Sequence, residues 1–90
     1  MRTIHMTVEG RVQGVGFRFS AQQKAKEFDV TGWVQNQRNG SVELEAQGEE
    51  TRIQSFIEAI KHGPSPYAKV TNTTVTDVDD APSYQLFQVK

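Results

Sequence analysis

Cysteine is absent from this sequence of 90 residues. That absence excludes disulfide bonds, thiol nucleophiles and thiolate metal sites, and it suits a reducing compartment. The sequence also lacks an apolar run of the roughly 20 residues that cross a bilayer, and its first residues lack the apolar segment of a signal peptide. We therefore expect a cytoplasmic protein that does not bind membranes.

An excess of one charge is missing as well. The sequence has ten Lys and Arg residues and eleven Asp and Glu residues, so its formal net charge is −1. Such a chain lacks the broad electrostatic attraction by which proteins bind nucleic acid, so any anion must be bound locally.

The composition, 36% hydrophobic and 23% charged, is that of an ordinary globular protein. We expect one domain over residues 1–90 and, by default for a small domain without an evident apolar patch, a monomer.

The spacing of apolar residues predicts secondary structure along the whole chain. Alternating apolar and polar residues, or runs rich in Val and Thr, predict strands, and apolar residues at intervals of three and four predict helices. Strands are expected at residues 4–8, 30–37, 41–47, 68–78 and 84–89, and helices at residues 17–28 and 49–62. Asn39-Gly40 predicts a tight hairpin between the second and third strands, and irregular alternation around Thr73 predicts a bulge in the fourth. Gly63-Pro64 predicts a left-handed cap at the end of the second helix.

The order of these elements is βαββαβ, followed by a short edge strand. It predicts an α+β sandwich of ferredoxin-like topology, with an antiparallel-rich sheet and both helices on one face. A right-handed crossover makes the first two strands parallel, so their C-terminal ends lie at the same end of the sheet. The loop after the first strand is therefore expected beside the segment around residues 33–38.

Residues 10–18, GRVQGVGFR, form that loop and contain three glycines and two arginines. Glycines let successive N–H groups converge on an anion, to which the following helix N-terminus adds its positive dipole end. Arg18 would stand in the first helical turn, where the dipole disfavours a cation, and its planar guanidinium suits phosphate oxygens. Two alternatives stay open at this point: the glycines serve only the turn from strand to helix, and Arg18 is a solvated or ion-paired surface residue.

Other kinds of chemistry find little support in the sequence. Dinucleotide and ATP binding are disfavoured, because the third glycine of G-x-G-x-x-G is missing and no Gly-Lys-Ser/Thr follows. His5 would project from the face of its strand opposite the apolar residues, and His62 ends a helix, so neither is expected near the loop as a base. Asp77, Asp79 and Asp80 cluster on a turn without EF-hand spacing, so we expect a solvated loop and no metal site.

Asn36 lies near the end of the second strand, where asparagine is a poor strand former. The expected topology places it beside the glycine loop, so it is a candidate partner of that loop. An equally strong alternative stays open, in which Asn36 has no role beyond beginning the turn around Asn39-Gly40.

Residues 10–18, together with Gly32-Trp33-Val34-x-Asn36 and the segment NGSVE at residues 39–43, resemble acylphosphatases. These are small enzymes that hydrolyse carboxyl-phosphate mixed anhydrides, and the resemblance covers essentially the whole chain. It implies that Arg18 holds the phosphate and that Asn36 positions the attacking water.

For this chemistry we expect a small acyl phosphate as substrate, and inorganic phosphate as product and competitive ligand. Loop N–H groups and Arg18 would hold the phosphate oxygens, and the substrate phosphate itself could accept the proton of the water. No cofactor, metal ion or phosphoenzyme is expected. The N–H groups are expected to come from Gln13, Gly14, Val15, Gly16 and Phe17.

Two other functions stay open. A similar domain occurs within larger maturation enzymes, so the chain could be a non-catalytic module that binds an anion or carbamoyl phosphate. An RNA-binding ferredoxin-like domain is a weaker alternative, because Glu43 and Glu45 on the expected third strand would repel phosphates. We assign Phe17, Phe19 and Phe28 to the core.

Overall fold

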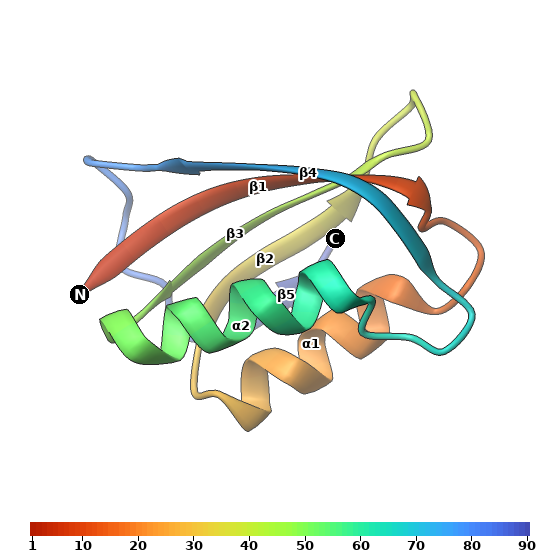
Figure 1. The fold of residues 1–90 in the computed structure, drawn as a ribbon. Helices are drawn as coiled ribbons and strands as arrows, with labels where there is room; N and C mark the ends of the chain where they lie inside the picture. The colour runs from red at the N-terminus through yellow and green to blue at the C-terminus, as the bar shows by residue number, and fades with distance from the viewer.

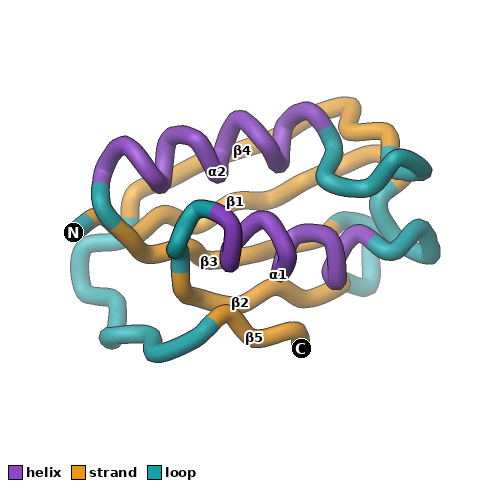
Figure 2. The backbone as a smooth tube through the Cα atoms, turned by 90° about the horizontal axis from the view of Figure 1, so that it is seen from below, coloured by secondary structure: helices purple, strands orange, loops and turns teal.

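Two helices cover one face of a five-stranded sheet in the computed structural model, which describes residues 1–90 (Figure 1). The elements in chain order are β1 (Arg2–Arg11), α1 (Phe17–Glu27), β2 (Thr31–Asn36), β3 (Val42–Gly48), α2 (Glu50–His62), β4 (Lys69–Asp77) and β5 (Phe87–Val89). Their order in the sheet is β4-β1-β3-β2-β5. Figure 2 shows both helices in front of the sheet, so the opposite face of the sheet carries no helix.

The strands pair as the sequence predicts. β3 lies between β1 and β2 and is antiparallel to both, so β1 and β2 run in the same direction. β5 pairs with β2 in parallel and forms one edge of the sheet. The ferredoxin-like topology with an additional C-terminal edge strand is therefore confirmed. The C-terminal ends of β1 and β2 lie at the same end of the sheet, where β1 leads into the loop before α1.

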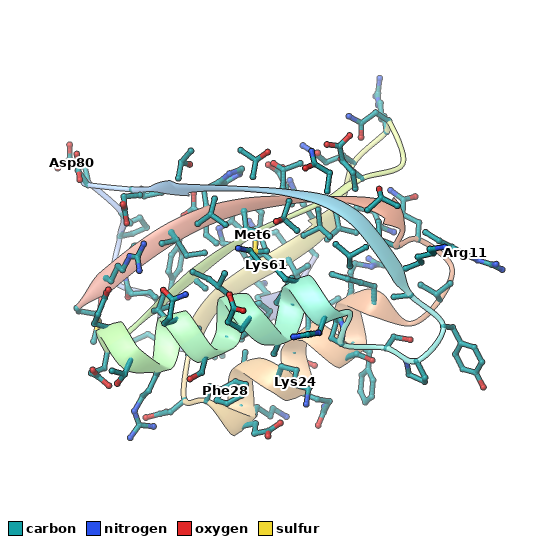
Figure 3. All side chains as sticks on the ribbon, viewed as in Figure 1. Met6, Arg11, Lys24, Phe28, Lys61 and Asp80 are labelled. Atoms are coloured by element: carbon teal, nitrogen blue, oxygen red, sulfur yellow. The ribbon has the colours of Figure 1, made fainter.

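The core lies between the sheet and the helices. Alternate residues of β1, namely Ile4, Met6 and Val8, are fully buried, and Figure 3 shows Met6 between the sheet and α2. Each large apolar side chain removed from water in this way contributes roughly 1.5–3 kcal/mol. The buried residues of α2 stand at the predicted helical spacing; they are Ile53, Phe56, Ile57 and Ile60.

α1 presents a smaller apolar surface to the sheet. Phe17, Ala21 and Ala25 are buried, and Phe28 is partly buried against the core. Phe19, however, is 64% exposed, so its assignment to the core is wrong. It follows Phe17 by two positions, which places it about 200° further around the helix, on the side away from the sheet.

α2 begins and ends close to the predicted positions. The Glu49 side chain caps its N-terminus by accepting a hydrogen bond from the Thr51 N–H group. At the other end, Gly63 has φ 91° and ψ 107°. Its φ is positive, but its backbone is not in the left-handed helical region that we expected of the cap. Neither helix has the length and apolar character needed to span a bilayer.

The hairpin between β2 and β3 is present, but its turn is longer than predicted. The N–H group of Gln37 donates to the carbonyl of Ser41 at 2.9 Å, which leaves three residues in the turn. Gly40 has φ 92°, whereas Asn39 does not have a positive φ. Asn39 instead acts through its side chain, which accepts a 3.0 Å hydrogen bond from the Ser41 N–H group.

β4 contains the predicted bulge. Glu9 of β1 pairs with Asn72, but the next residue, Gly10, pairs with Val70. Thr71 is therefore the extra residue of β4. The break in apolar alternation that the sequence shows around this point follows from the bulge, because one extra residue moves the side chains that follow to the other face.

Candidate active site

The loop between β1 and α1 depends on two glycines in the left-handed region. Gly14 has φ 74° and Gly16 has φ 75°, and Gly16 is also the N-cap residue of α1. A Cβ atom at either position would meet no atom within 4 Å. Glycine is therefore favoured here by its backbone conformation and not by lack of space, since other residues adopt this conformation at a cost.

This conformation leaves a run of main-chain donors without partners in the protein. The N–H groups of residues 13–19 donate no hydrogen bond to any backbone or side-chain acceptor. Three of these groups belong to the first turn of α1, whose positive dipole end adds to their effect. The loop and helix start thus form a region that favours an anion.

The loop is held to the rest of the protein on two sides. The side-chain amide of Gln13 donates to the carbonyl oxygens of Gln37 and Ser41, each at 2.8 Å. On the other side, Ser65 donates from Oγ to the carbonyl of Val15 at 2.7 Å, and it is only 5% exposed. The sequence showed no motif around Ser65, so its contact with the loop could not be predicted.

The predicted residues Arg18 and Asn36 are brought together with the loop. They line one hollow of about 230 Å³, together with Gly14, Gly16, Phe17, Phe19 and Val89. Of the other predicted loop residues, Gln13 is directed to the hairpin by its side-chain hydrogen bonds, and Val15 packs against the core. These two can contribute to the hollow only through their main-chain groups.

Asn36 reaches this place because it is the last residue of β2. Side chains alternate along a strand, so Asn36 shares the helix-facing side of the sheet with the buried Val34. Beyond the end of the core it becomes exposed, and its side chain makes no hydrogen bond within the protein. An exposed amide beside the unpaired N–H groups can hold a polar ligand or a water molecule.

Val89 of β5 lines the hollow, and Lys90, which follows β5, contacts Arg18; the sequence assigned neither to the site. The Arg18 side chain donates from Nη1 to the main-chain oxygen of Lys90 at 2.7 Å. Lys90 is in turn held by its N–H group, which donates to the carbonyl of Val34 at 2.8 Å. The sequence predicted an edge strand here but contained no sign that its end supports Arg18.

His5 lies away from the loop, as expected. His5 is on the face of the sheet without helices, where its Nε2 is 3.0 Å from Oε2 of Glu43 and its ring meets Trp33 edge-on at 6.3 Å. This hydrogen bond from His5, and a second from Gln35, lower the pKa of the Glu43 carboxyl below its ordinary value. On the same face, burial and a hydrogen bond to a glutamate raise the pKa of the Tyr84 phenol.

The aspartates of the β4–β5 turn are also remote. Figure 3 shows Asp80 at the opposite end of the molecule from Arg11, which ends β1 beside the loop. Asp77 is paired with Arg2 at 2.9 Å. No group of three acidic or histidine side chains in the structure is arranged to hold a metal ion.

The fold and this site define a class of protein, a ferredoxin-like α+β sandwich whose glycine loop, arginine and strand-end asparagine meet at one end of the sheet. The acylphosphatase family model matches residues 4–89. The acylphosphatase of Oceanobacillus iheyensis is 41% identical over 90 residues, which is 100% of this chain and 99% of that protein. The chain therefore belongs to the acylphosphatase family, and its activity is the hydrolysis of acyl phosphates.

Solved structures agree with this assignment. The crystal structure of acylphosphatase from Bacillus subtilis has a TM-score of 0.95 and 42% sequence identity, and the match covers 100% of this chain and 99% of that one. Full-length HypF, in its phosphate- and nucleotide-bound form, has a TM-score of 0.86 and 27% identity, with 99% of this chain but only 12% of that one covered. The same fold thus also occurs as a small part of a much larger protein.

Proposed function

We propose that the loop binds the phosphate of a small acyl phosphate. The main-chain N–H groups of residues 13–17 and the guanidinium of Arg18 would donate to the phosphate oxygens. The observation that carries this proposal is the run of unpaired N–H groups at residues 13–19, which includes Arg18, beside a hollow that Arg18 and Asn36 both line. These donors are fixed before the substrate binds, so they can stabilise charge as it redistributes in the transition state.

Asn36 would hold the water that attacks phosphorus. The water oxygen forms a bond to phosphorus as the bond between phosphorus and the acyl oxygen breaks, and the electron pair leaves on the carboxylate. The proton of the water passes to a phosphate oxygen, and the products are a carboxylate and inorganic phosphate. A carboxylate leaves without protonation, so this route needs no histidine, in agreement with the position of His5 on the other face of the sheet.

The acyl group would lie toward the two exposed apolar side chains of the hollow. Phe19 is 64% exposed and Val89 is 39% exposed, and both line the hollow with Arg18. Contact with them would remove apolar surface of the acyl group from water. This arrangement accounts for an exposed phenylalanine in the first turn of α1.

One copy of the chain supplies every residue in this scheme, which supports function as a monomer. The positive groups that meet the phosphate are a guanidinium and N–H dipoles, so the scheme includes no metal ion. Inorganic phosphate, as the product, would compete for the same donors. A cytoplasmic location stays a prediction from the sequence.

Hydrolysis of benzoyl phosphate, followed by ultraviolet absorbance with and without EDTA, tests the proposal. We expect turnover well above the rate in buffer, equal in both conditions and inhibited by inorganic phosphate. Loss of activity in EDTA would contradict the metal-free scheme. Phosphate binding without turnover would instead favour a non-catalytic anion-binding module.

A further inference from the structure

We propose that Gln13 is a positioning residue, which fixes the phosphate-binding loop at the correct distance from Asn36. The proposal rests on the roles proposed above for the loop and for Asn36, but it assigns to the Gln13 side chain a task that its main-chain N–H group does not perform. It concerns the rate of the reaction and not the binding of phosphate.

The Gln13 side chain joins the loop to the β2–β3 hairpin. Its Nε2 group uses both hydrogens, one for the carbonyl of Gln37 and one for that of Ser41, at 2.8 Å each. These two acceptors are 24 and 28 positions away in the sequence. They belong to the residue pair that closes the β2–β3 hairpin, in which the Gln37 N–H group also donates to Ser41 at 2.9 Å. One side chain therefore joins the loop to the hairpin.

The hairpin position matters because Gln37 directly follows Asn36 in the chain. The Asn36 side chain has no hydrogen bond of its own within the protein. Its place relative to the loop therefore depends on its backbone, which Gln13 ties to the loop at the next residue. A displacement of about 1 Å between a reacting group and its partner can cost about a hundred-fold in rate.

Ser65 provides a matched comparison within the same loop. Its Oγ donates to the carbonyl of Val15 at 2.7 Å, so it also holds the loop. Its other hydrogen bonds are with Tyr67 and Ala68, and none joins it to the hairpin or to Asn36. Loss of the Ser65 hydrogen bond should loosen the loop without changing how the loop is joined to Asn36 in particular.

A double-mutant cycle with benzoyl phosphate separates positioning from general support. Gln13→Met keeps the length of the side chain and removes both donors, and Ser65→Ala is the control. Each is made in the native chain and with Asn36→Ala, and kcat, KM and the inhibition constant of phosphate are measured. Folding of every variant is checked by circular dichroism.

We expect Gln13→Met to lower kcat by about ten-fold or more and to change the phosphate inhibition constant by less than about two-fold. With Asn36→Ala present, the same substitution should change kcat by less than about two-fold, because no positioned water remains to be lost. Ser65→Ala should have the same fractional effect in both backgrounds. If Gln13→Met does not fold at the assay temperature, Gln13→Asn serves instead, since it keeps the amide but is one methylene too short to reach both carbonyls.

Full activity in Gln13→Met overturns the proposal. Equal loss with and without Asn36→Ala also overturns it, as does a loss that appears only in phosphate inhibition. Failure of the proposed function looks different, because there the native chain shows no turnover or Asn36→Ala keeps the native kcat.

Discussion

Arg18 Nη1 donates a 2.7 Å hydrogen bond to the main-chain oxygen of Lys90, so the residue that follows β5 supports the arginine in the first turn of α1. Lys90 is anchored twice, by the hydrogen bond from its N–H group to Val34 and by its Nζ, which lies 4.6 Å from the centre of the Trp33 ring. A guanidinium has five N–H donors, and one contact with Lys90 leaves the others for a ligand. The contact with Lys90 thus orients Arg18 and leaves its other donors free.

Arg18→Lys should therefore behave almost like Arg18→Ala. A lysine keeps the charge, but its compact ammonium cannot bind Lys90 and two phosphate oxygens in a planar arrangement. We expect both variants to lower kcat/KM by about a hundred-fold and to raise the inhibition constant of phosphate by about ten-fold. Steady-state kinetics with benzoyl phosphate measure both. Near-native kinetics in Arg18→Lys would show that charge alone is needed at this position.

Asn36→Ala should separate rate from binding. If Asn36 holds the attacking water and does not touch the phosphate, kcat falls by about a hundred-fold while phosphate inhibits as in the native chain. Asn72→Ala is a suitable control, since Asn72 is an exposed asparagine of β4 that bonds to Glu9 away from the hollow. Equal loss of phosphate inhibition and of rate would instead place Asn36 on the phosphate.

Glycine at position 10 is required for a different reason from glycine in the loop. A Cβ atom on Gly10 would lie 2.1 Å from the carbonyl oxygen of Lys69 and 2.8 Å from the N atom of Thr71, because the β4 bulge brings that backbone close. We expect Gly10→Ala to lower the free energy of unfolding by about 3 kcal/mol or more. Gly14→Ala meets no atom and bears only the cost of a positive φ, about 1–2 kcal/mol. Urea denaturation compares the two, and equal losses would contradict the role of the close approach.

The fold could be predicted from the sequence because its elements have strong periodicity. The alternation of Ile4, Met6 and Val8 puts all three side chains on one face only if the segment is a strand. The spacing of the apolar residues of α2 does so only if that segment is a helix. The crossover rule then decides the direction of β2. The errors occurred where a pattern permits more than one geometry. Asn39-Gly40 fits a two-residue turn and the longer turn that forms, and Phe19 is apolar but lies on the exposed side of α1.

The site was predictable in part for the same kind of reason. Arg18 and Asn36 stand at the ends of elements whose topology could be deduced, so their proximity followed from the fold. The contacts of Gln13, Ser65 and Lys90 could not be deduced. Each joins segments that are far apart in the sequence by a hydrogen bond between a side chain and a main-chain oxygen, and almost any residue can supply that oxygen.

The pair of His5 and Glu43 should make stability depend on pH in the acidic range. The hydrogen bond from His5 lowers the pKa of Glu43 below its ordinary value of 4.5, and Gln35 adds to the effect. The carboxylate therefore stabilises the fold above pH 4.5, and this contribution is lost as the pH falls through the lowered pKa. We expect Glu43→Gln to be less stable than the native chain by about 1 kcal/mol near neutral pH and nearly equal to it at low pH.

Urea denaturation at a series of pH values measures this difference for Glu43→Gln. Glu58→Gln is the control, because Glu58 is exposed and its ion pair with Lys61 on the same helix is long, at 4.0 Å. Its difference from the native chain should be small at every pH. A stability difference for Glu43→Gln that does not change with pH would contradict the role of the His5 hydrogen bond.

Phe19 should influence which acyl phosphate is preferred. Its ring is exposed beside Arg18 and Val89 in the hollow, where an apolar acyl group can contact it but the methyl group of acetyl phosphate offers little surface. We expect Phe19→Ala to lower kcat/KM for benzoyl phosphate by about five-fold relative to acetyl phosphate, with phosphate inhibition unchanged. Leu86→Ala is the matched control, since Leu86 is 63% exposed but lies outside the hollow. An equal loss for both substrates would show that Phe19 supports Arg18 or α1, and that the acyl group lies elsewhere.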